Sequence, residues 1–335
     1  TAQLKAKIGE IIAEKLSFTA PAITATIEKG GSLYQAQFDY QQNKEWIGTL
    51  TRTKINPNGS IDANDVDNWS AAEEVPNPSS RKIWSVIPGT DYTVDYNNFI
   101  DTYATEIGNV MSLYENDIQD YHRKTDTSGG SSLLRRCANS AGVEDGTDDD
   151  LKGLINFVRG ADYFDYDADC NLTEMRKNNK GKKIYLGDIY HSQLLVVGAP
   201  SADSEFSNIN QEAYFRKVNG YDAWKDSLKS RDDNPVIYAG SNSGILHAFD
   251  ANSGKEKWGF VPPLVSPYLP LVINNNLNSS KGGGSNAIFG VDGSIVAHDI
   301  YFKSPLGTAK KWHTILLVPY GRGGAGMSVL DVTNP

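Results

Sequence analysis

The clearest alternation of apolar runs and polar turns lies in residues 235–263. An apolar run occurs there at 236–239, further strand-like runs occur at 245–250 and 255–260, and the polar segments 241–244 and 251–254 separate the three. Each polar segment ends in glycine, which adopts a positive φ without a steric clash and therefore suits a tight turn. The pattern predicts three antiparallel strands in a meander, which is too small to be stable alone and needs neighbouring sheets.

Three residues of this meander, Asp250, Gly254 and Trp258, carry a further pattern. Residues 248–258, which contain them, resemble the tryptophan-docking repeat of quinoprotein-type propellers. In that repeat the aspartate caps the turn, the glycine permits it, and the tryptophan docks between two blades, where it buries about 150–250 Å². The stretch therefore favours a β-propeller blade. An ordinary meander in a β-sandwich is the alternative interpretation.

A second meander follows near the end of the chain. Its predicted strands lie within residues 287–302, 311–319 and 326–332. Asp331 repeats the strand-end position of Asp250. We therefore interpret residues 161–335 as the first blades of a partial β-propeller. Because about two blades cannot close a ring, we expect further blades beyond residue 335 in the native protein.

The first half of the chain predicts a different organisation. Residues 1–21 predict the amphipathic last helix of a preceding domain, and residues 22–96 predict a β-rich linker module. In that module Tyr34, Ala36, Phe38 and Tyr40 alternate with polar residues, which is typical of a strand with one buried face. Residues 97–160 predict a helical insertion with an acidic loop, because apolar residues first recur there at helical spacing, over 97–121. The fold class is therefore mainly β with helical insertions.

Composition excludes some classes of partner. The chain has 335 residues, of which 39% are hydrophobic, with a net charge of −9 and a pI near 5.1. This acidic balance argues against a nucleic-acid binder and against adhesion to anionic lipid by charge alone. No apolar run approaches the roughly 18–20 residues of a membrane-spanning helix. Because the chain starts at Thr1 rather than at Met, we expect processing or truncation upstream.

The two cysteines, Cys137 and Cys170, lie in polar, loop-like sequence. In an exported protein they predict one disulfide, which would close a loop of about 34 residues and stabilise the fold by about 3–4 kcal/mol. Free thiols in a cytosolic protein are the alternative. The spacing of the two residues does not match a metal site.

A polar, mostly acidic cluster surrounds the second cysteine, Cys170. Its residues are Asp165, Asp167, Asp169, Asn171 and Glu174. Carboxylates at alternate positions of a tight loop can converge on one hard cation, so the cluster is a candidate Ca²⁺ site. The loop is not an EF-hand, because Cys170 replaces the usual glycine and Arg176 replaces the final glutamate. A solvated acidic turn is the alternative interpretation.

Other polar motifs have a structural interpretation. The acidic stretches at 62–67 and 145–150 predict solvated loops, with metal binding as the alternative for the first. The histidines have no zinc spacing, and we interpret His247 and His298 as structural residues. The glycine-rich segment 321–326 lacks the lysine of a P-loop and predicts a turn. The sequence contains no G-x-S-x-G, H-E-x-x-H or dinucleotide-binding motif.

Several segments, taken in order, resemble the PilY1/PilC family of type IV pilus tip-associated proteins. They are 46–50, 69–72, 81–83, 154–160, 186–192, 235–263 and 292–299, followed by 321–326 and 330–333. The resemblance implies an N-terminal von Willebrand A-like domain, of which residues 1–21 would be the last helix, then a linking β region and a C-terminal propeller. The family's known calcium loop lies in a later blade and is not assigned to any residue of this chain.

The resemblance also implies a function. It predicts a non-enzymatic protein of pilus assembly and adhesion, at the pilus tip or outer membrane of a Gram-negative bacterium. The expected partners are minor pilins at the fibre tip and a host or abiotic surface. Two alternatives stay open: a quinoprotein dehydrogenase that binds pyrroloquinoline quinone, and a purely structural outer-membrane scaffold segment. The dehydrogenase class would have adjacent cysteines, whereas Cys137 and Cys170 are far apart.

Overall fold

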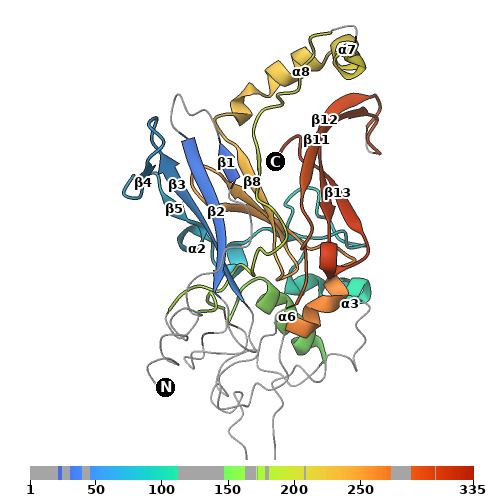
Figure 1. Ribbon diagram of the computed structural model, residues 1–335. Helices are drawn as coiled ribbons and strands as arrows, with labels where there is room; N and C mark the ends of the chain where they lie inside the picture. Colours follow the sequence, from blue (N-terminus) through green and yellow to red (C-terminus); the bar gives the residue numbers. More distant parts are fainter. Residues whose placement is uncertain are drawn as a thin grey trace, which may run out of the picture.

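The computed structural model describes residues 22–24, 31–39, 46–111, 147–162, 171, 173–177, 181–206, 209–272, 288–305 and 307–335 (Figure 1). Within these residues the chain forms three β-sheets with short helices around them. None of the three sheets closes on itself in the described part. The fold is therefore mainly β with helical segments, as the sequence predicts. The helix predicted for residues 1–21 lies outside the described residues.

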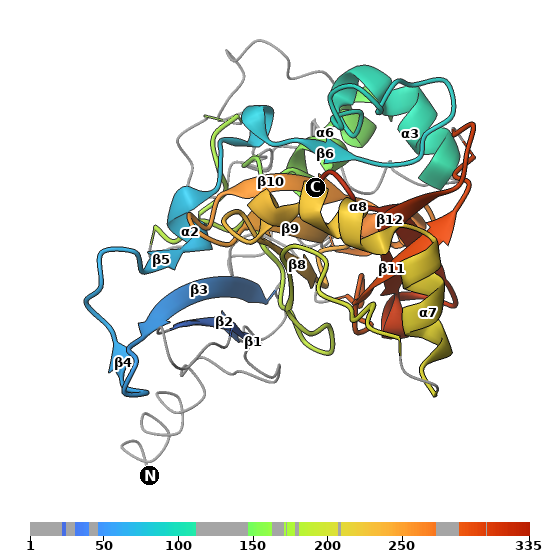
Figure 2. The ribbon, with the colours of Figure 1, turned by 90° about the horizontal axis from the view of Figure 1, so that it is seen from above.

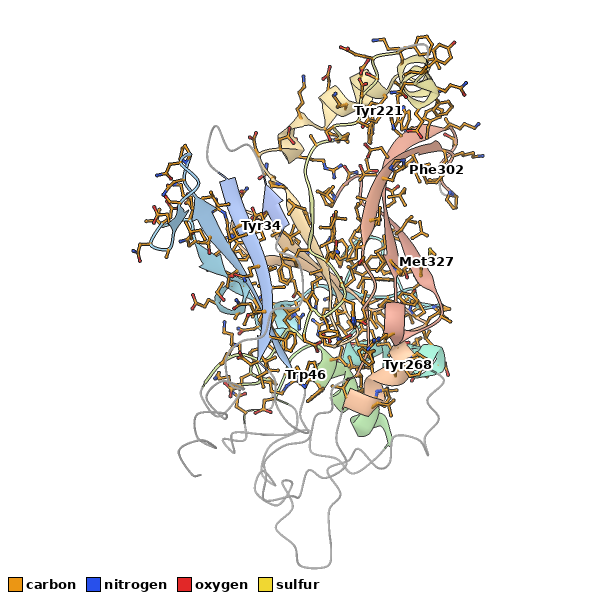
Figure 3. The ribbon with its side chains drawn as sticks, in the orientation of Figure 1. Tyr34, Trp46, Tyr221, Tyr268, Phe302 and Met327 are labelled. Carbon is orange, nitrogen blue, oxygen red and sulfur yellow. The ribbon has the colours of Figure 1, made fainter. Side chains whose placement is uncertain are left out.

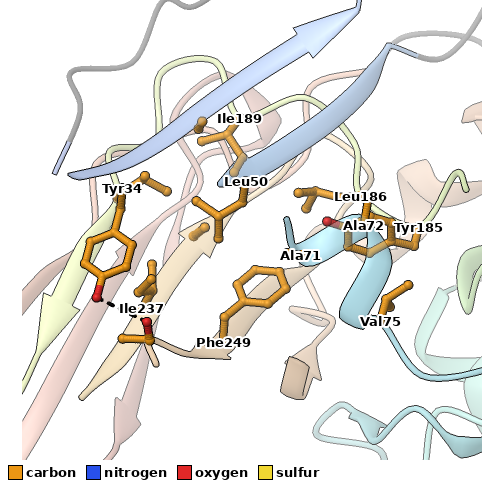
Figure 4. Close-up of a cluster of buried hydrophobic side chains, with 14 of the residues drawn as sticks. Tyr34, Leu50, Ala71, Ala72, Val75, Tyr185, Leu186, Ile189, Ile237 and Phe249 are labelled. Carbon is orange, nitrogen blue, oxygen red and sulfur yellow. Dashed lines mark hydrogen bonds between the residues drawn. The ribbon is translucent and has the colours of Figure 1, made fainter. Parts of the chain in front are cut away.

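The N-terminal sheet consists of β1 (Ala22–Thr24), β2 (Gly31–Asp39), β3 (Ile47–Ile55), β4 (Ile61–Asp62) and β5 (Trp69–Ser70). Strand β3 pairs with β2, β4 and β5. Strand β2 alternates as predicted, because Tyr34, Ala36 and Phe38 are buried and the residues after each are partly exposed. Tyr34 and Leu50 pack against Ile237 and Phe249 of the second, central sheet in one buried cluster (Figure 4). The alternation therefore places one face of β2 toward the rest of the protein.

The central sheet has the strand order β6-β10-β9-β8-β7. Its strands are β6 (Ile83–Trp84), β7 (Leu195–Val197), β8 (Val236–Gly240), β9 (Leu246–Asp250) and β10 (Glu256–Phe260). Strands β8, β9 and β10 form the predicted antiparallel meander, with Gly244 (φ 87°) and Gly254 (φ 74°) in its turns. Strand β7 adds an antiparallel neighbour to β8, and β6 adds a short parallel neighbour to β10.

The third sheet is the second predicted meander. Its antiparallel strands are β11 (Val296–Phe302), β12 (Lys311–Pro319) and β13 (Met327–Asp331). The third sheet lies beside the central sheet in two perpendicular views (Figures 1 and 2). Leu246 and Phe260 of the central sheet share one buried cluster with Leu316 and Val318 of the third. This packing is the arrangement expected of adjacent propeller blades.

Short helices cover the ends of the sheets. They are α2 (Ala71–Glu74), η2 (Pro78–Ser80), η3 (Asp101–Tyr103), α3 (Ala104–Met111), α6 (Thr147–Val158), α7 (Gln211–Val218), α8 (Tyr221–Ser227), η5 (Lys229–Arg231), η6 (Ser266–Val272) and η7 (Gly321–Gly323). Ile107 of α3, Leu154 of α6 and Leu269 of η6 pack together with Ile83 and Ile245 of the central sheet region. The structure describes the predicted helical stretch 97–121 only as far as residue 111. Its apolar side chains Phe99, Ile107 and Met111 are buried in the core.

Residues 209–231, which we call the α7–α8 segment, leave the central sheet between β7 and β8. In Figure 1 this segment extends from the upper end of the central sheet toward β11 and β12. Tyr221 and Trp224 pack on Trp312 of β12, with ring centroids 4.8 and 6.1 Å from that of Trp312. The Trp312 Nε1–H donates a hydrogen bond of 2.9 Å to the Asn219 carbonyl. The α7–α8 segment thus joins the central sheet to the third sheet.

One expectation about an element boundary differs from the structure. The spaced apolar residues of 186–198 predict one strand from the sequence, but only Leu195–Val197 form β7. Before β7, Gly187 forms only an isolated antiparallel bridge with Ile47, and a Cβ on Gly187 would lie 2.5 Å from the Ser243 amide nitrogen. Residues 22–96 are predicted as a linker module, yet β6 pairs with β10 of the central sheet. The linker region therefore contributes a strand to the blade, while the division into domains stays a prediction.

Candidate functional site at the seam between two sheets

A buried ionic cluster lies where β6 meets β10. The Arg81 guanidinium donates two hydrogen bonds to the Glu256 carboxylate, of 2.6 Å from Nε and 2.7 Å from Nη2. His247 Nδ1 lies 2.7 Å from Oε1 of the same carboxylate. The side chains of all three residues are at most 1% exposed. Because the bidentate pair satisfies both charges, the cluster is buried without leaving one of them unpaired.

The cluster sets the ionisation of its members. Burial alone would raise the pKa of Glu256, but the charge of Arg81 and the hydrogen bonds from Arg81 and His247 hold that pKa far below its ordinary value. Burial lowers the pKa of His247 and outweighs the attraction of Glu256. At neutral pH, Glu256 is therefore an anion and His247 is neutral. The neutral imidazole donates from Nδ1 to Glu256 and presents Nε2 as an acceptor.

Ser241 completes an arrangement that is similar to a catalytic triad. Its Oγ lies 3.1 Å from His247 Nε2, and Glu256 orients the imidazole from the other side. This is the geometry of a serine nucleophile with its base. Ser241 has no exposed surface, however, and its hydroxyl also bonds to the Ile245 carbonyl at 3.1 Å. A substrate cannot reach such a hydroxyl, so we interpret Ser241, His247 and Glu256 as structural residues.

A second buried arginine joins the helices to this cluster. Arg159, which follows α6, donates from Nη2 to the Pro78 carbonyl at 2.9 Å and from Nη1 to the Phe99 carbonyl at 3.0 Å. Its own carbonyl accepts a hydrogen bond of 2.7 Å from Arg81 Nη1. Burial, together with the charge of Arg81, lowers the pKa of Arg159 to about 10. In the sequence, Arg81 and Arg159 stand only within family-like segments, and their long-range contacts have no local signal.

A cavity of about 350 Å³ lies where β7 of the central sheet faces β11 of the third sheet. We call it the seam cavity. One wall consists of residues 195–202, and the opposite wall consists of residues 297–299. Thr314 of β12 and Arg216 of α7 also line it. The seam cavity is thus built from both predicted blades and from the α7–α8 segment.

Hydrogen bonds fix the polar groups beside the seam cavity. The Asp299 carboxylate accepts from the Tyr221 hydroxyl at 2.6 Å and from the Thr314 hydroxyl at 3.0 Å. The Thr314 hydroxyl in turn accepts from Arg231 Nη1 at 3.1 Å. Burial, the hydrogen bond to Asp299 and the charge of Asp299 raise the pKa of Tyr221, so its hydroxyl stays a donor. Figure 3 shows Tyr221 in the α7–α8 segment, at the end of the molecule where Phe302 of β11 lies.

A histidine–aspartate pair joins the segments that lead into β7 and β11. His191 Nδ1 lies 2.6 Å from Asp292 Oδ2, and the His191 amide donates to Asp292 Oδ1 at 3.2 Å. The Asp292 side chain is 1% exposed, whereas that of His191 is 42% exposed. The Asp292 amide also donates to the Tyr320 carbonyl at 3.1 Å. This pair is a further polar link between the central and third sheets.

Asp250 and Gly254, the predicted turn residues, lie between β9 and β10. Asp250 Oδ1 accepts hydrogen bonds from the amides of Ser253 at 2.8 Å and Asn252 at 3.1 Å. A Cβ on Gly254 would lie 2.6 Å from the Trp69 ring. The turn therefore packs on the N-terminal sheet.

Trp258, predicted to dock between blades, lies partly buried against the cluster that the central and third sheets share. The described aromatic rings beside it belong to its own sheet, with centroids at 5.8 Å for Tyr238 and 6.1 Å for Trp84. Trp84 also stacks on Tyr92 at 5.7 Å. The buried cluster that the central and third sheets share thus includes a group of aromatic residues, of which only Trp258 is predicted from the sequence as a docking residue.

The candidate calcium residues are described only in part. Asp165, Asp167 and Asp169 lie outside the described residues, as do Cys137 and Cys170. Glu174 forms an ion pair of 2.9 Å with Lys177, and Asn171 accepts a hydrogen bond of 3.1 Å from the Thr173 hydroxyl. In the described part of the chain, no group of three or more His, Cys, Asp or Glu residues could hold a metal ion. The calcium site and the disulfide stay predictions.

Comparison with known protein families finds a match over the part of the chain that contains the strands β7 to β13. The sequence model of the PilY1 β-propeller domain matches residues 186–335. This span contains both meanders, both walls of the seam cavity and the α7–α8 segment. Over these residues the chain is similar to the PilY1 family. The resemblance inferred from the sequence is therefore confirmed, and the matched span contains the strands β7 to β13.

Curated PilY1 proteins extend the similarity across the chain. The chain is 27% identical to the "Type IV pilus biogenesis factor PilY1" of Pseudomonas aeruginosa over 326 residues, which are 95% of this chain and 23% of that protein. It is 35% identical to a PilY1 homolog of Xylella fastidiosa over 181 residues, 54% of this chain and 13% of that protein. The chain thus spans less than a quarter of the length of these two PilY1 proteins. No solved structure matches it. Among the helices described, none has the length and apolar character needed to cross a membrane.

Proposed function

We propose that this chain is a structural part of a type IV pilus biogenesis factor and acts in pilus assembly. The observation that supports this role is the seam, where two antiparallel meanders pack together within the residues that match the PilY1 propeller. The curated PilY1 proteins similar to this chain are named type IV pilus biogenesis factors. We propose that this chain acts in the same process, type IV pilus biogenesis.

Binding by a surface, without catalysis, is the proposed mode of action. The arrangement of Ser241, His247 and Glu256 is buried, and Asp299 at the seam cavity is occupied by protein hydroxyl groups. We propose minor pilins at the fibre tip as partners, together with a host or abiotic surface in adhesion. The proposed location is the cell surface of a Gram-negative bacterium, at the pilus tip or outer membrane.

The third sheet has an exposed apolar face, which supports the proposal that this sheet is one blade of a larger propeller. Its exposed apolar residues are Val296, Ile300, Met327 and Val329. Neighbouring blades of a propeller cover both faces of each sheet, and exposed apolar patches commonly mark contact surfaces. We propose that a further sheet of the longer protein covers this face.

Calcium binding by residues 165–174 is a separate proposal. It is supported by the alternate spacing of Asp165, Asp167 and Asp169, which suits oxygen ligation of a hard cation. Calorimetric titration of the chain with CaCl₂ tests it, beside the variant Asp167→Ala and the matched control Asp62→Ala. Heat that is lost in Asp167→Ala and kept in Asp62→Ala supports the site. No heat with the unaltered chain contradicts it.

The role in assembly is tested by replacing the native gene in its bacterium. The variant Leu246→Asp places a charge in the cluster between the two sheets, where Leu246 has no exposed surface. We expect that this variant and a gene deletion lose most surface pili, measured as sheared pilin per cell. The control Lys311→Gln, at an exposed position of β12, keeps them.

Protein levels and adhesion complete this test. Immunoblots of cell extracts show whether each variant accumulates, because a charged core residue also lowers stability. Adhesion is then compared between strains with equal piliation. A deletion strain with unchanged surface pili contradicts the role in assembly, and unchanged adhesion at equal piliation contradicts the role in adhesion.

A further inference from the structure

Helix α7 presents apolar side chains to solvent. Tyr214, Phe215 and Val218 lie on one side of the helix because of their spacing, and all three are exposed. Phe206 extends this surface, since it is exposed and its ring centroid lies 5.0 Å from that of Tyr214. Ile209, just before the helix, is 93% exposed. We call these five side chains the α7 face.

The α7 face lies beside the third sheet. The Phe215 ring centroid is 6.1 Å from those of Tyr301 in β11 and Trp312 in β12. Figure 1 shows α7 together with the adjoining ends of β11 and β12 at the upper end of the molecule. We call residues 302–312, which join these two strands, the hairpin end. The α7 face and the hairpin end are therefore neighbours in space.

The hairpin end carries an excess of positive charge. Its charged residues Lys303, Lys310 and Lys311 are all exposed, and its sequence contains no acidic residue. Within the part of the chain that the structure describes, none of these three lysines takes part in an ion pair. Their charges are therefore available to an anionic partner.

Acidic residues near α7 reduce this excess only in part. Within the α7–α8 segment each acidic residue has a basic partner. The pairs are Glu212 with Arg216, Asp222 with Lys217, and Asp226 with Lys229. Asp203 and Glu205, which precede Phe206, are exposed and form no ion pair with a described residue. Two unpaired carboxylates thus stand against the three unpaired lysines of the hairpin end.

The further sheet proposed above would leave the α7 face uncovered. That sheet would pack on the outer side of β11, where Ile300 is exposed. Tyr301 follows Ile300 in the same strand and therefore points to the opposite side, where it contacts Phe215. Closing the propeller on the outer side therefore does not account for the α7 face.

Exposed aromatic side chains next to lysines suit the interface of a lipid bilayer. Aromatic rings favour the headgroup level of a bilayer, and lysines are attracted to anionic headgroups. A projecting side chain such as Ile209 can enter a bilayer directly, whereas a protein partner would have to provide a matching groove. The combination of the α7 face and the hairpin end therefore favours a lipid surface.

We propose that the α7 face and the hairpin end together bind the surface of a bilayer with anionic phospholipid headgroups. The apolar side chains of the α7 face enter the interface, and the three lysines contact the headgroups. Because the net charge of −9 opposes long-range attraction, binding depends on both parts of this surface. The inference goes beyond the proposed role in pilus assembly, and its test measures binding alone.

The test is co-sedimentation of the chain with lipid vesicles. Mixed vesicles of phosphatidylcholine and phosphatidylglycerol provide the anionic surface, and vesicles of phosphatidylcholine alone are the comparison. We expect the chain to bind the mixed vesicles about tenfold more tightly, because each lysine near an anionic surface contributes to the affinity. Absence of binding to the mixed vesicles, or equal binding to both kinds, overturns the proposal.

One variant examines the apolar part of the surface. Ile209→Ser removes an exposed apolar side chain and is expected to weaken binding to the mixed vesicles about tenfold. The matched control is Val66→Ser, because Val66 is 95% exposed and lies between β4 and β5 of the N-terminal sheet. This control is expected to bind like the unaltered chain.

A double variant examines the charged part. Lys310→Gln with Lys311→Gln is expected to weaken binding to the mixed vesicles about tenfold and to leave binding to phosphatidylcholine unchanged. The control, Lys82→Gln with Lys255→Gln, changes the net charge equally at exposed positions beside the central sheet and is expected to bind like the unaltered chain.

Two further outcomes overturn the proposal. The first is an equal effect of either variant and its control on binding to the mixed vesicles. The second concerns a second copy of the chain as the occupant of the α7 face, which sedimentation velocity without vesicles examines. Self-association that Ile209→Ser abolishes, together with no vesicle binding, would assign the α7 face to a second copy instead of a lipid surface.

Discussion

The central and third sheets are both antiparallel meanders, but they differ in how many faces are buried. In the central sheet, β8 is buried along its whole length, because the N-terminal sheet covers one face and the third sheet covers the other. In the third sheet one face joins the shared cluster, and the other exposes Val296 (52%), Ile300 (38%), Met327 (58%) and Val329 (59%). The same strand arrangement therefore serves as an interior layer in one case and as an outer layer in the other.

The sequences of the two meanders carry this difference. Residues 236–239 of β8 are continuously apolar, as in a strand buried on both faces. Residues 296–300 of β11 alternate between more and less exposed positions, as in a strand with one covered face. The central sheet also contains the buried ionic pair of Arg81 and Glu256, whereas the pair of His313 and Asp331 in the third sheet is partly exposed. Burial on both faces thus coincides with a charge pair that water does not screen.

The largest expected effect is on the central sheet, from Arg81→Met. This change leaves the Glu256 carboxylate buried without its cation, and we expect a loss of about 3–5 kcal/mol in the free energy of unfolding. Urea denaturation followed by circular dichroism measures it. The double variant Arg81→Met with Glu256→Leu serves as the control, since it removes both charges and should recover much of the loss. Equal stability of the single variant and the unaltered chain would show that the pair does not hold β6 on β10.

The two faces of the third sheet are compared by two truncations. Leu316→Ala removes a side chain with no exposed surface from the shared cluster, and we expect a loss of about 2–4 kcal/mol. Val329→Ala acts on the exposed face and should change stability by about 0.5 kcal/mol or less. The same urea denaturation measures both variants. A loss of similar size in both would mean that the outer face is also covered.

The turn of the central sheet provides a smaller contrast. Gly254→Ala requires a positive φ of an alanine and brings its Cβ to 2.6 Å from the Trp69 ring, so we expect a loss of about 1–3 kcal/mol. Gly59→Ala is the matched control, because Gly59 also has a positive φ (83°) but no atom within 4 Å of an added Cβ. Thermal unfolding of the two variants measures the difference. If Gly59→Ala is as destabilising as Gly254→Ala, packing on Trp69 contributes nothing.

The pH dependence gives the smallest and most gradual effect. The folded pKa of His247 lies below its ordinary value of 6.5, so the unfolded state binds a proton first and stability falls as pH decreases through that value. The folded pKa of Glu256 lies below 4.5, so a further loss begins near that pH. We expect a slope of roughly 1 kcal/mol per pH unit between about pH 6.5 and 5 from His247. Urea denaturation across this range should show a flatter profile for His247→Gln, and an unchanged profile contradicts the assignment.

Local sequence patterns predict the two meanders well. The features that these patterns do not predict depend on contacts between residues far apart in the sequence. Gly244, Gly254 and the apolar runs beside them carry the hairpin information within a few residues. Arg81 meets Glu256 across 175 positions of sequence, and no periodicity reports such a pair. Residues 186–194 contain spaced apolar residues as a strand does, but Gly187 forms only an isolated bridge with Ile47 there. The seam cavity likewise combines residues from 195 to 314, so its members appear unrelated in the sequence.

Native-state hydrogen exchange of the chain tests the central comparison most directly. The amides of β9 lie in a sheet covered on both faces, and we predict that they exchange only through global unfolding, with a free energy equal to that from urea denaturation. The amides of β13 lie at the edge of a sheet covered on one face, and we predict exchange through local opening with a lower free energy. Equal protection of β9 and β13 would contradict the account of one interior and one outer sheet.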